Sequence, residues 1–137
     1  MELNDAIYKY LSTYSGLTSL VKKRIYPDVM PDKVTLPAVT YQLVSEDETE
    51  SFNQPTTDLL FAVYSLTAWA TTRTEAHDVG KQIRTAFKNY SGAMGGTGGV
   101  SVSAVRKIGR YTDVDRTQEG AVIAYKNIQD IEISYHM

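Results

Sequence analysis

The stretch from Leu59 to Tyr90 constrains the fold more than any other part of the chain, because an unbroken apolar run is followed at once by an amphipathic pattern. The run from Leu59 to Ala70 reads LLFAVYSLTAWA and contains no charged residue, proline or glycine. Its β-branched, aromatic and aliphatic side chains favour a strand. We therefore predict a long, central strand here.

A helix is predicted directly after this strand. Residues 72–75 have the Thr-x-x-Glu pattern, in which the hydroxyl and the carboxylate satisfy backbone N–H groups at the start of a helix. Apolar residues then recur at intervals of three and four, and charged residues occupy the other positions. The apolar positions are Ala76, Val79, Ile83, Ala86, Phe87 and Tyr90. One face of this helix should therefore pack on a sheet.

Hydrophobic periodicity also predicts the flanking elements. An apolar stripe at helical spacing begins at Leu3, Gly16 is well placed to end this first helix, and a shorter helical turn starts at Thr18. Three prolines make residues 27–37 an extended surface crossing. Strand patterns cover Ala38–Ser45, Val100 toward Tyr111, and Ala121–Tyr135, with polar turn residues over Asp113–Gly120.

These elements predict one α+β domain over residues 1–137. Strands that are adjacent in sequence and joined by loops pair antiparallel, and one long helix must cover a face of the sheet. We expect a four-stranded, mainly antiparallel sheet with the long helix on one face and a helix pair at the N-terminus. Trp69, close to the strand end, should bridge strand and helix. The residues expected in or next to the core are Val63, Trp69, Val79, Ile83 and Phe87.

The composition argues against several classes of function. Lys and Arg total 14 against 16 Asp and Glu, so the chain lacks the excess positive charge that sequence-independent nucleic-acid binding needs. The absence of cysteine excludes disulfides, thiolate zinc sites and cysteine nucleophiles. The N-terminus lacks signal-peptide features, and no stretch approaches the ~20 apolar residues of a membrane span. We expect a protein of a cytoplasm-like compartment that uses no cofactor and contacts no membrane.

No arrangement of residues typical of catalysis is visible in the sequence. His77 lies beside an aspartate on a polar helix face, while Asp113 and Asp115 lie in a turn-rich segment where aspartate usually bonds its own backbone. An enzyme that uses these three residues is one alternative, and a soluble binding module with an apolar pocket between helix and sheet is another. No catalytic, cofactor-binding or metal-binding residue is assigned.

Two unusual loops are predicted. Residues 46–58 carry five carboxylates and no basic residue, so self-repulsion favours a long mobile loop at a hairpin tip. Loops of this length in small domains tend to be functional or disordered, which makes this one a candidate interface or channel loop. Its candidate residues are Glu46, Asp47, Glu48, Glu50, Phe52 and Asp58. Residues 92–99 hold five glycines after a helix and before a strand, the order of a flexible connector and not of a phosphate cradle.

Short motifs along nearly the whole chain share one family pattern. LTSLV at 17–21, RIYP at 24–27 and LPAVTY at 36–41 precede a strand that ends in Trp69-Ala70 and a helix that opens near Glu75. The closing IEISY at 131–135 fits a terminal strand. Together these motifs resemble the tail-completion family of long-tailed bacteriophages and prophages.

The resemblance implies a structural protein of virion assembly and not an enzyme. Such a tail-terminator or head–tail joining protein caps the finished tail tube and offers the capsid connector a docking surface. It acts as a ring, generally of six subunits, whose partners are the tail tube protein and a head-completion or connector protein. DNA passes through the channel without specific binding, and an acidic wall would keep it from adhering. The implied location is the head–tail interface of the virion, with host cytoplasm during assembly.

Overall fold

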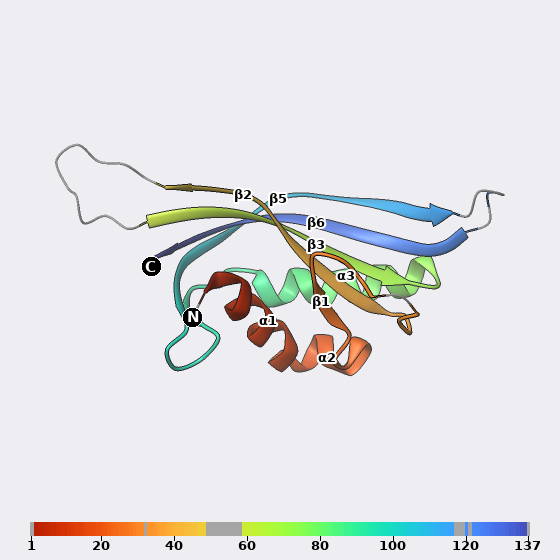
Figure 1. Ribbon diagram of the computed structural model, residues 1–137, viewed down its shortest axis with the longest axis horizontal. Coiled ribbons are helices and arrows are strands. Elements are labelled where there is room, and N and C mark those ends of the chain that lie inside the picture. Colours follow the sequence, from red (N-terminus) through yellow and green to blue (C-terminus); the bar gives the residue numbers. More distant parts are fainter. Residues whose placement is uncertain (1, 32, 49–58, 117–119, 121, 137) are drawn as a thin grey trace.

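The computed structural model describes residues 2–31, 33–48, 59–116, 120 and 122–136. This part of the chain forms three helices and six strands (Figure 1). The helices are α1 (Leu3–Thr13), α2 (Ser15–Val21) and α3 (Arg73–Phe87). The strands are β1 (Ile25–Pro27), β2 (Ala38–Glu48), β3 (Leu59–Ala70), β4 (Gly92–Met94), β5 (Val100–Arg116) and β6 (Val122–His136).

All six strands belong to one mixed sheet in the order β1-β2-β3-β6-β5-β4. β1 and β2 run parallel, and every other neighbouring pair is antiparallel. The prediction of a four-stranded sheet is therefore wrong, because the three-residue strands β1 and β4 extend it on both sides. β1 ends in a proline and β4 begins in a glycine-rich run, residues that sheets tolerate mainly at their edges.

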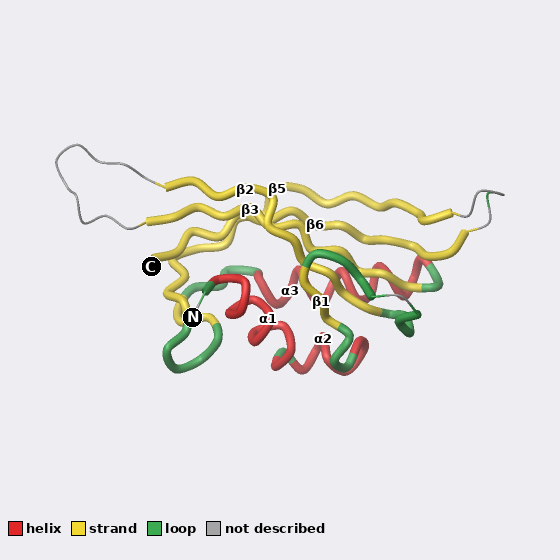
Figure 2. Tube along the Cα trace, in the orientation of Figure 1, coloured by secondary structure: helices red, strands yellow, loops and turns green. Residues whose placement is uncertain are grey.

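The sheet curls around helix α1. This helix contacts both β1 and β4, which are the outermost strands on opposite sides of the six-stranded sheet. In a flat sheet, five spacings of about 4.8 Å would hold these edges about 24 Å apart, whereas a helix is only about 10–12 Å wide. The sheet must therefore bend strongly, and Figure 2 shows the helices gathered on its concave side.

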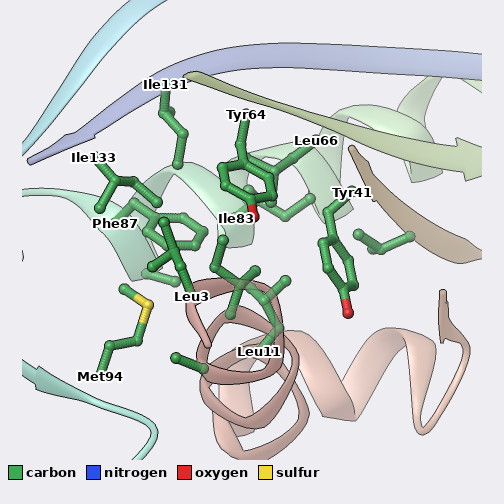
Figure 3. Packing of buried hydrophobic residues seen from close by; sticks show 14 of the residues in the cluster. Leu3, Leu11, Tyr41, Tyr64, Leu66, Ile83, Phe87, Met94, Ile131 and Ile133 are labelled. Atoms are coloured by element: carbon green, nitrogen blue, oxygen red, sulfur yellow. The ribbon is translucent and has the colours of Figure 1, made fainter. Parts of the chain in front are cut away.

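The hydrophobic core lies between this concave face and the three helices (Figure 3). Even-numbered residues of β3 from Leu60 to Ala70 are buried, and the odd-numbered ones are half-buried on the other face. Val79, Ile83 and Phe87 of α3 are fully buried. Val63 and Trp69 instead lie on the convex face, because alternate strand residues point to opposite sides.

The hydrogen bond and the cation–π contact of Trp69 both join it to its neighbours in the sheet. Its indole N–H donates to the Thr40 hydroxyl over 3.0 Å, and the Lys126 ammonium lies 4.7 Å from its ring centroid. Neither of these contacts reaches α3, so the expected bridge between strand and helix stays a prediction.

Helix α3 begins where the capping pattern predicted and lies close to the sheet. The Thr72 hydroxyl accepts a hydrogen bond from the Glu75 N–H over 3.2 Å. Gly80 faces β6, where its carbonyl accepts a hydrogen bond from the Gln129 side chain. A Cβ atom at Gly80 would lie 2.4 Å from Asn127 Oδ1, so the missing side chain permits this close approach.

Several predicted boundaries are wrong where pairing between strands overrides local composition. β5 continues to Arg116 through residues expected to form a turn, because β6 pairs with it along this length. β2 continues to Glu48, into the segment predicted as an acidic loop. Gly16 lies inside α2 and does not end α1, which ends at Thr13.

Candidate functional site

Two long strands, β2 and β5, lie next to the short outermost strands on opposite sides of the sheet. β1 covers the outer edge of β2 only over Val39–Tyr41, and β4 covers β5 only over Val100–Val102. Within the described chain, no strand pairs with the outer side of residues 42–48 or 103–116. We call these segments the β2 edge and the β5 edge. Each presents unpaired backbone donors and acceptors, which can pair with another strand.

The β5 edge is exposed on both faces. After Val102, every residue of β5 is exposed or only partly buried, so this part of the strand contributes little to the core. Ile108 and Tyr111, with exposed fractions of 50% and 53%, are large apolar side chains left in solvent. Exposed apolar residues along an unpaired strand are typical of a contact surface.

Basic side chains converge beneath the β5 edge. Lys107 and Arg110 project toward α3 and line a hollow of about 270 Å³ together with Arg84. Partial desolvation, followed by the positive charges of Arg84, Lys88 and Arg110, lowers the pKa of Lys107. Asp130 also lines the hollow, but no ion pair joins it to these cations among the described residues. We call the four cations the basic cluster.

Acidic side chains gather around a second hollow of the concave face, which extends from the β2 edge across the sheet to Val100 at the start of β5. Glu2, Asp28 and Glu46 line a hollow of about 670 Å³ whose wall also includes Tyr64 and Tyr135. The Tyr135 hydroxyl donates to Glu46 Oε2 over 2.9 Å. Burial, and then this bond to a carboxylate, raises the pKa of Tyr135. We call these three carboxylates the acidic cluster.

A third hollow, of about 510 Å³, lies between the start of α3 and the β5–β6 hairpin. His77 and Asp113 both line it, and Asp115 does not. The Asp115 carboxylate lies 3.8 Å from the ammonium of Lys126, which is also a lining residue. The wall of this hollow also includes Asn127, whose side-chain oxygen has no hydrogen-bond partner among the described atoms. No group of metal-ligating residues occurs in the described part of the chain.

The residues predicted as an interface or channel loop are only partly covered by the structure. Glu46 and Asp47 are exposed residues of β2, and Glu48 ends this strand. Glu50, Phe52 and Asp58 lie outside the described residues. The role of this segment therefore stays a prediction.

Sequence reasoning missed the basic cluster. Its members come from α3 and β5, which are far apart in sequence. The available signal was local: Arg84 and Lys88 are four residues apart, so they lie on one helix face. Their convergence with β5 depends on how the helix packs on the sheet.

A comparison with known protein families shows to which family the chain belongs. Residues 5–122 match the model of the family described as "Tail completion protein gp17". The chain belongs to this family. The resemblance found in the sequence is thereby confirmed, and the enzyme alternative is wrong, because tail completion proteins are structural. This chain is therefore a structural tail completion protein.

A solved virion shows the same fold. A chain from the "Virion of native gene transfer agent (GTA) particle" superposes with a TM-score of 0.69 at 14% identity, covering 98% of this chain and 95% of that one. No curated protein sequence matches. Among the described helices, none combines the length and the hydrophobicity needed to cross a membrane.

Proposed function

We propose that this tail completion protein caps the tail tube and forms the head–tail joining interface as an oligomeric ring, of six subunits, around the DNA channel. Its partners are then other copies of itself, the tail tube protein and a head-completion or connector protein. DNA passes through the ring without specific binding.

The β5 edge is the observation that carries this proposal. A long strand with unpaired backbone and exposed apolar residues is a liability in a protein that acts alone, because it recruits other strands. Monomeric proteins usually shorten or cover such an edge. β4 covers only the first three residues of the seventeen in β5. In a ring, the uncovered remainder of β5 can pair with a neighbouring subunit.

The formal charge supports passage of DNA without capture. The chain carries a net charge of -2, so a ring of identical copies gives no excess of cations along which phosphates would bind. The cations of the basic cluster are gathered at one edge of the subunit, where a neighbour can neutralise them.

The direct test combines light scattering with electron microscopy. The purified protein, alone and mixed with tail tubes, should give a species whose mass is a multiple of 15.3 kDa and rings seated on one end of each tube. When particles are assembled without this protein, separate heads and tails should accumulate. Adding the protein back should join them. A protein that stays monomeric and never binds tubes would overturn the proposal.

A further inference from the structure

We propose that the ring closes by pairing the β5 edge of one subunit with the β2 edge of the next, so that the basic cluster of one copy meets the acidic cluster of its neighbour. This inference rests on the proposed ring and specifies which surfaces form it. The occupant of each edge is a second copy of this chain.

The uncovered parts of the two edges lie at the same level of the sheet, where a level is a row of residues that are paired from strand to strand. The pairing registers connect Gln42 through Ser65 and Asp130 to Gly109, and they connect Asp47 through Phe61 and Ser134 to Ala104. β2 runs antiparallel to β5, because three successive pairings reverse the direction. In a ring whose axis runs along the strands, rotation moves no residue along that axis. Residues 42–47 of one copy therefore meet residues 104–109 of the next as an antiparallel pair.

Charges of opposite sign fall at matching levels. Arg110 shares its level with Tyr41 through Gln129 and Leu66. The backbone N–H of Asp28 donates to the Tyr41 carbonyl over 2.9 Å, which places Asp28 beside the same residue. Arg110 of one copy thus faces Asp28 of the next.

Lys107 completes the charge match. It shares its level with Leu43 through Ile131 and Tyr64, and this level lies between Asp28 and Glu46. A carboxylate from the neighbour would also offset the positive charges of Arg84, Lys88 and Arg110 around Lys107.

Apolar side chains match in the same way. Val44 and Ile108 occupy irregular positions in their ladders, where the pairing register shifts. Both are largely in solvent, with exposed fractions of 60% and 50%. Their levels differ by about one residue. They would therefore meet across the interface between the two subunits, which we call the seam, and both would be buried from water there.

Charged residues and bulges on edge strands also serve to prevent pairing. That purpose requires only that an edge repel copies of itself. Here the two edges carry opposite signs, so each repels its own kind and attracts the other. A head-to-tail contact between two different patches generates a ring when the rotation between neighbours closes.

Charge reversal tests the seam. One variant, Lys107→Glu with Arg110→Glu, makes the basic side acidic, and a second, Asp28→Lys with Glu46→Lys, makes the acidic side basic. Position 28 has a positive φ of 63°, and two lysines of this chain, Lys22 and Lys33, also have a positive φ. Each variant alone should fall to the monomer mass of 15.3 kDa. An equimolar mixture should regain rings, since each variant then meets an edge of opposite sign.

Controls separate the seam from folding and from the proposed function. Lys22→Glu with Lys23→Glu changes the same number of charges at the exposed end of α2 and should leave ring mass unchanged. Circular dichroism should show both reversed variants folded, and Glu46→Gln, which keeps an acceptor for Tyr135, replaces Glu46→Lys if that change unfolds the chain.

The outcomes are distinguishable. Wild-type rings together with unchanged assembly of both reversed variants would overturn the seam and leave the proposed function standing. Intact rings that lose retention of duplex DNA on Lys107→Glu and Arg110→Glu would show that the basic cluster faces DNA, which also overturns the seam. A wild-type protein that assembles neither alone nor on tubes would overturn both proposals.

Discussion

Strands β3 and β5 are long members of the same sheet, yet they make opposite contributions to the protein. β3 has neighbours on both sides and alternates buried with half-buried residues along all of its twelve positions. β5 has seventeen residues, and only Val100 and Val102 are buried. Strand length is therefore no measure of how much a strand stabilises the fold. A strand's position in the sheet and its contact with the helices decide how much it stabilises the fold.

The difference separates stability from assembly within one sheet. The core joins the concave side of the sheet to the helices, and of the apolar residues of β5 after Val102, only Val105 packs against it. The outer part of β5 can then carry charged and apolar residues chosen for contacts with a neighbour. Substitutions in the first region should change the free energy of unfolding, and substitutions in the second should change association.

The largest expected effect is that of Phe87→Ala. The Phe87 ring is 1% exposed and lies edge-to-face with Tyr10 at a centroid distance of 5.6 Å. Its truncation should lower the free energy of unfolding by about 3–5 kcal/mol and give poorly soluble protein. Urea denaturation measures this change. The matched control is Tyr111→Ala on β5, which should change stability by less than about 1 kcal/mol. Similar losses from both substitutions would break the contrast between the core and the outer part of β5.

A smaller loss is expected for Gly80→Ala, where α3 packs on the sheet. Alanine would gain about 1 kcal/mol in helix propensity, but its Cβ would lie 2.4 Å from the buried Asn127 oxygen. Overpacking typically costs about 1–3 kcal/mol, so the net change should be destabilising by up to about 2 kcal/mol.

A double-mutant cycle isolates the cause of that loss. In an Asn127→Ala background the obstructing side chain is gone, so Gly80→Ala should become neutral or stabilising. The free energies of unfolding of all four proteins give the coupling. Equal destabilisation in both backgrounds would refute the steric explanation.

Tyr64 should make the free energy of unfolding depend on pH in the alkaline range. Its hydroxyl donates to Asn4 Oδ1 over 3.1 Å, and burial, followed by the charge of Glu46, raises its pKa to about 12. Burial likewise raises the pKa of Tyr10 and Tyr41 to about 12. An unfolded tyrosine titrates near pH 10, so this stabilisation is complete below about pH 10 and is lost as pH rises through about 12.

The variant Tyr64→Phe should therefore act twice. Near pH 7 it removes one hydrogen bond and should cost about 0.5–1.5 kcal/mol. Between about pH 10 and 12 its stability should fall less steeply than that of the wild type, because one raised pKa is gone. Urea midpoints measured across this pH range give both slopes, and equal slopes would contradict the assignment.

The elements that the sequence predicted well are those whose signals are local. The capping pattern and the apolar spacing of α3 need no knowledge of other segments, and the unbroken apolar run marks β3 wherever it pairs. The short strands β1 and β4 have only three residues each, too few to show a period, and their neighbours in the sheet define them. The end of β5 was missed because Asp113 and Asp115 favour turns, whereas pairing with β6 holds them in a strand.

The candidate surfaces depended on information that the sequence does not carry. Both faces of β3 are apolar, so alternation alone could not show that Leu66 faces the helices and Trp69 the convex side. Of the acidic cluster, only Glu46 belongs to the acidic run that the sequence shows, and the basic cluster joins α3 to β5 only in the folded chain. The match between the charges of the two edges could be recognised only from the complete pairing register of the sheet.

The smallest expected change in stability is that of Ile108→Thr. Ile108 is 50% exposed on the β5 edge, and threonine keeps the β-branched shape that strands favour, so the free energy of unfolding should change by no more than about 0.5 kcal/mol. Its effect should appear in association, because the contact with Val44 of a neighbour would lose apolar area. Ring dissociation on dilution, followed by light scattering, measures it.

The matched control lies three residues earlier in the same strand. Val105 is partly buried against the core, so Val105→Thr places a hydroxyl among apolar groups and should cost about 1 kcal/mol in stability, with little effect on the seam. The two substitutions should thus affect different measurements although they alter neighbouring parts of β5. If Ile108→Thr reduced stability as much as Val105→Thr, the outer part of β5 would belong to the core, and the division between a stabilising and an assembling region would fail.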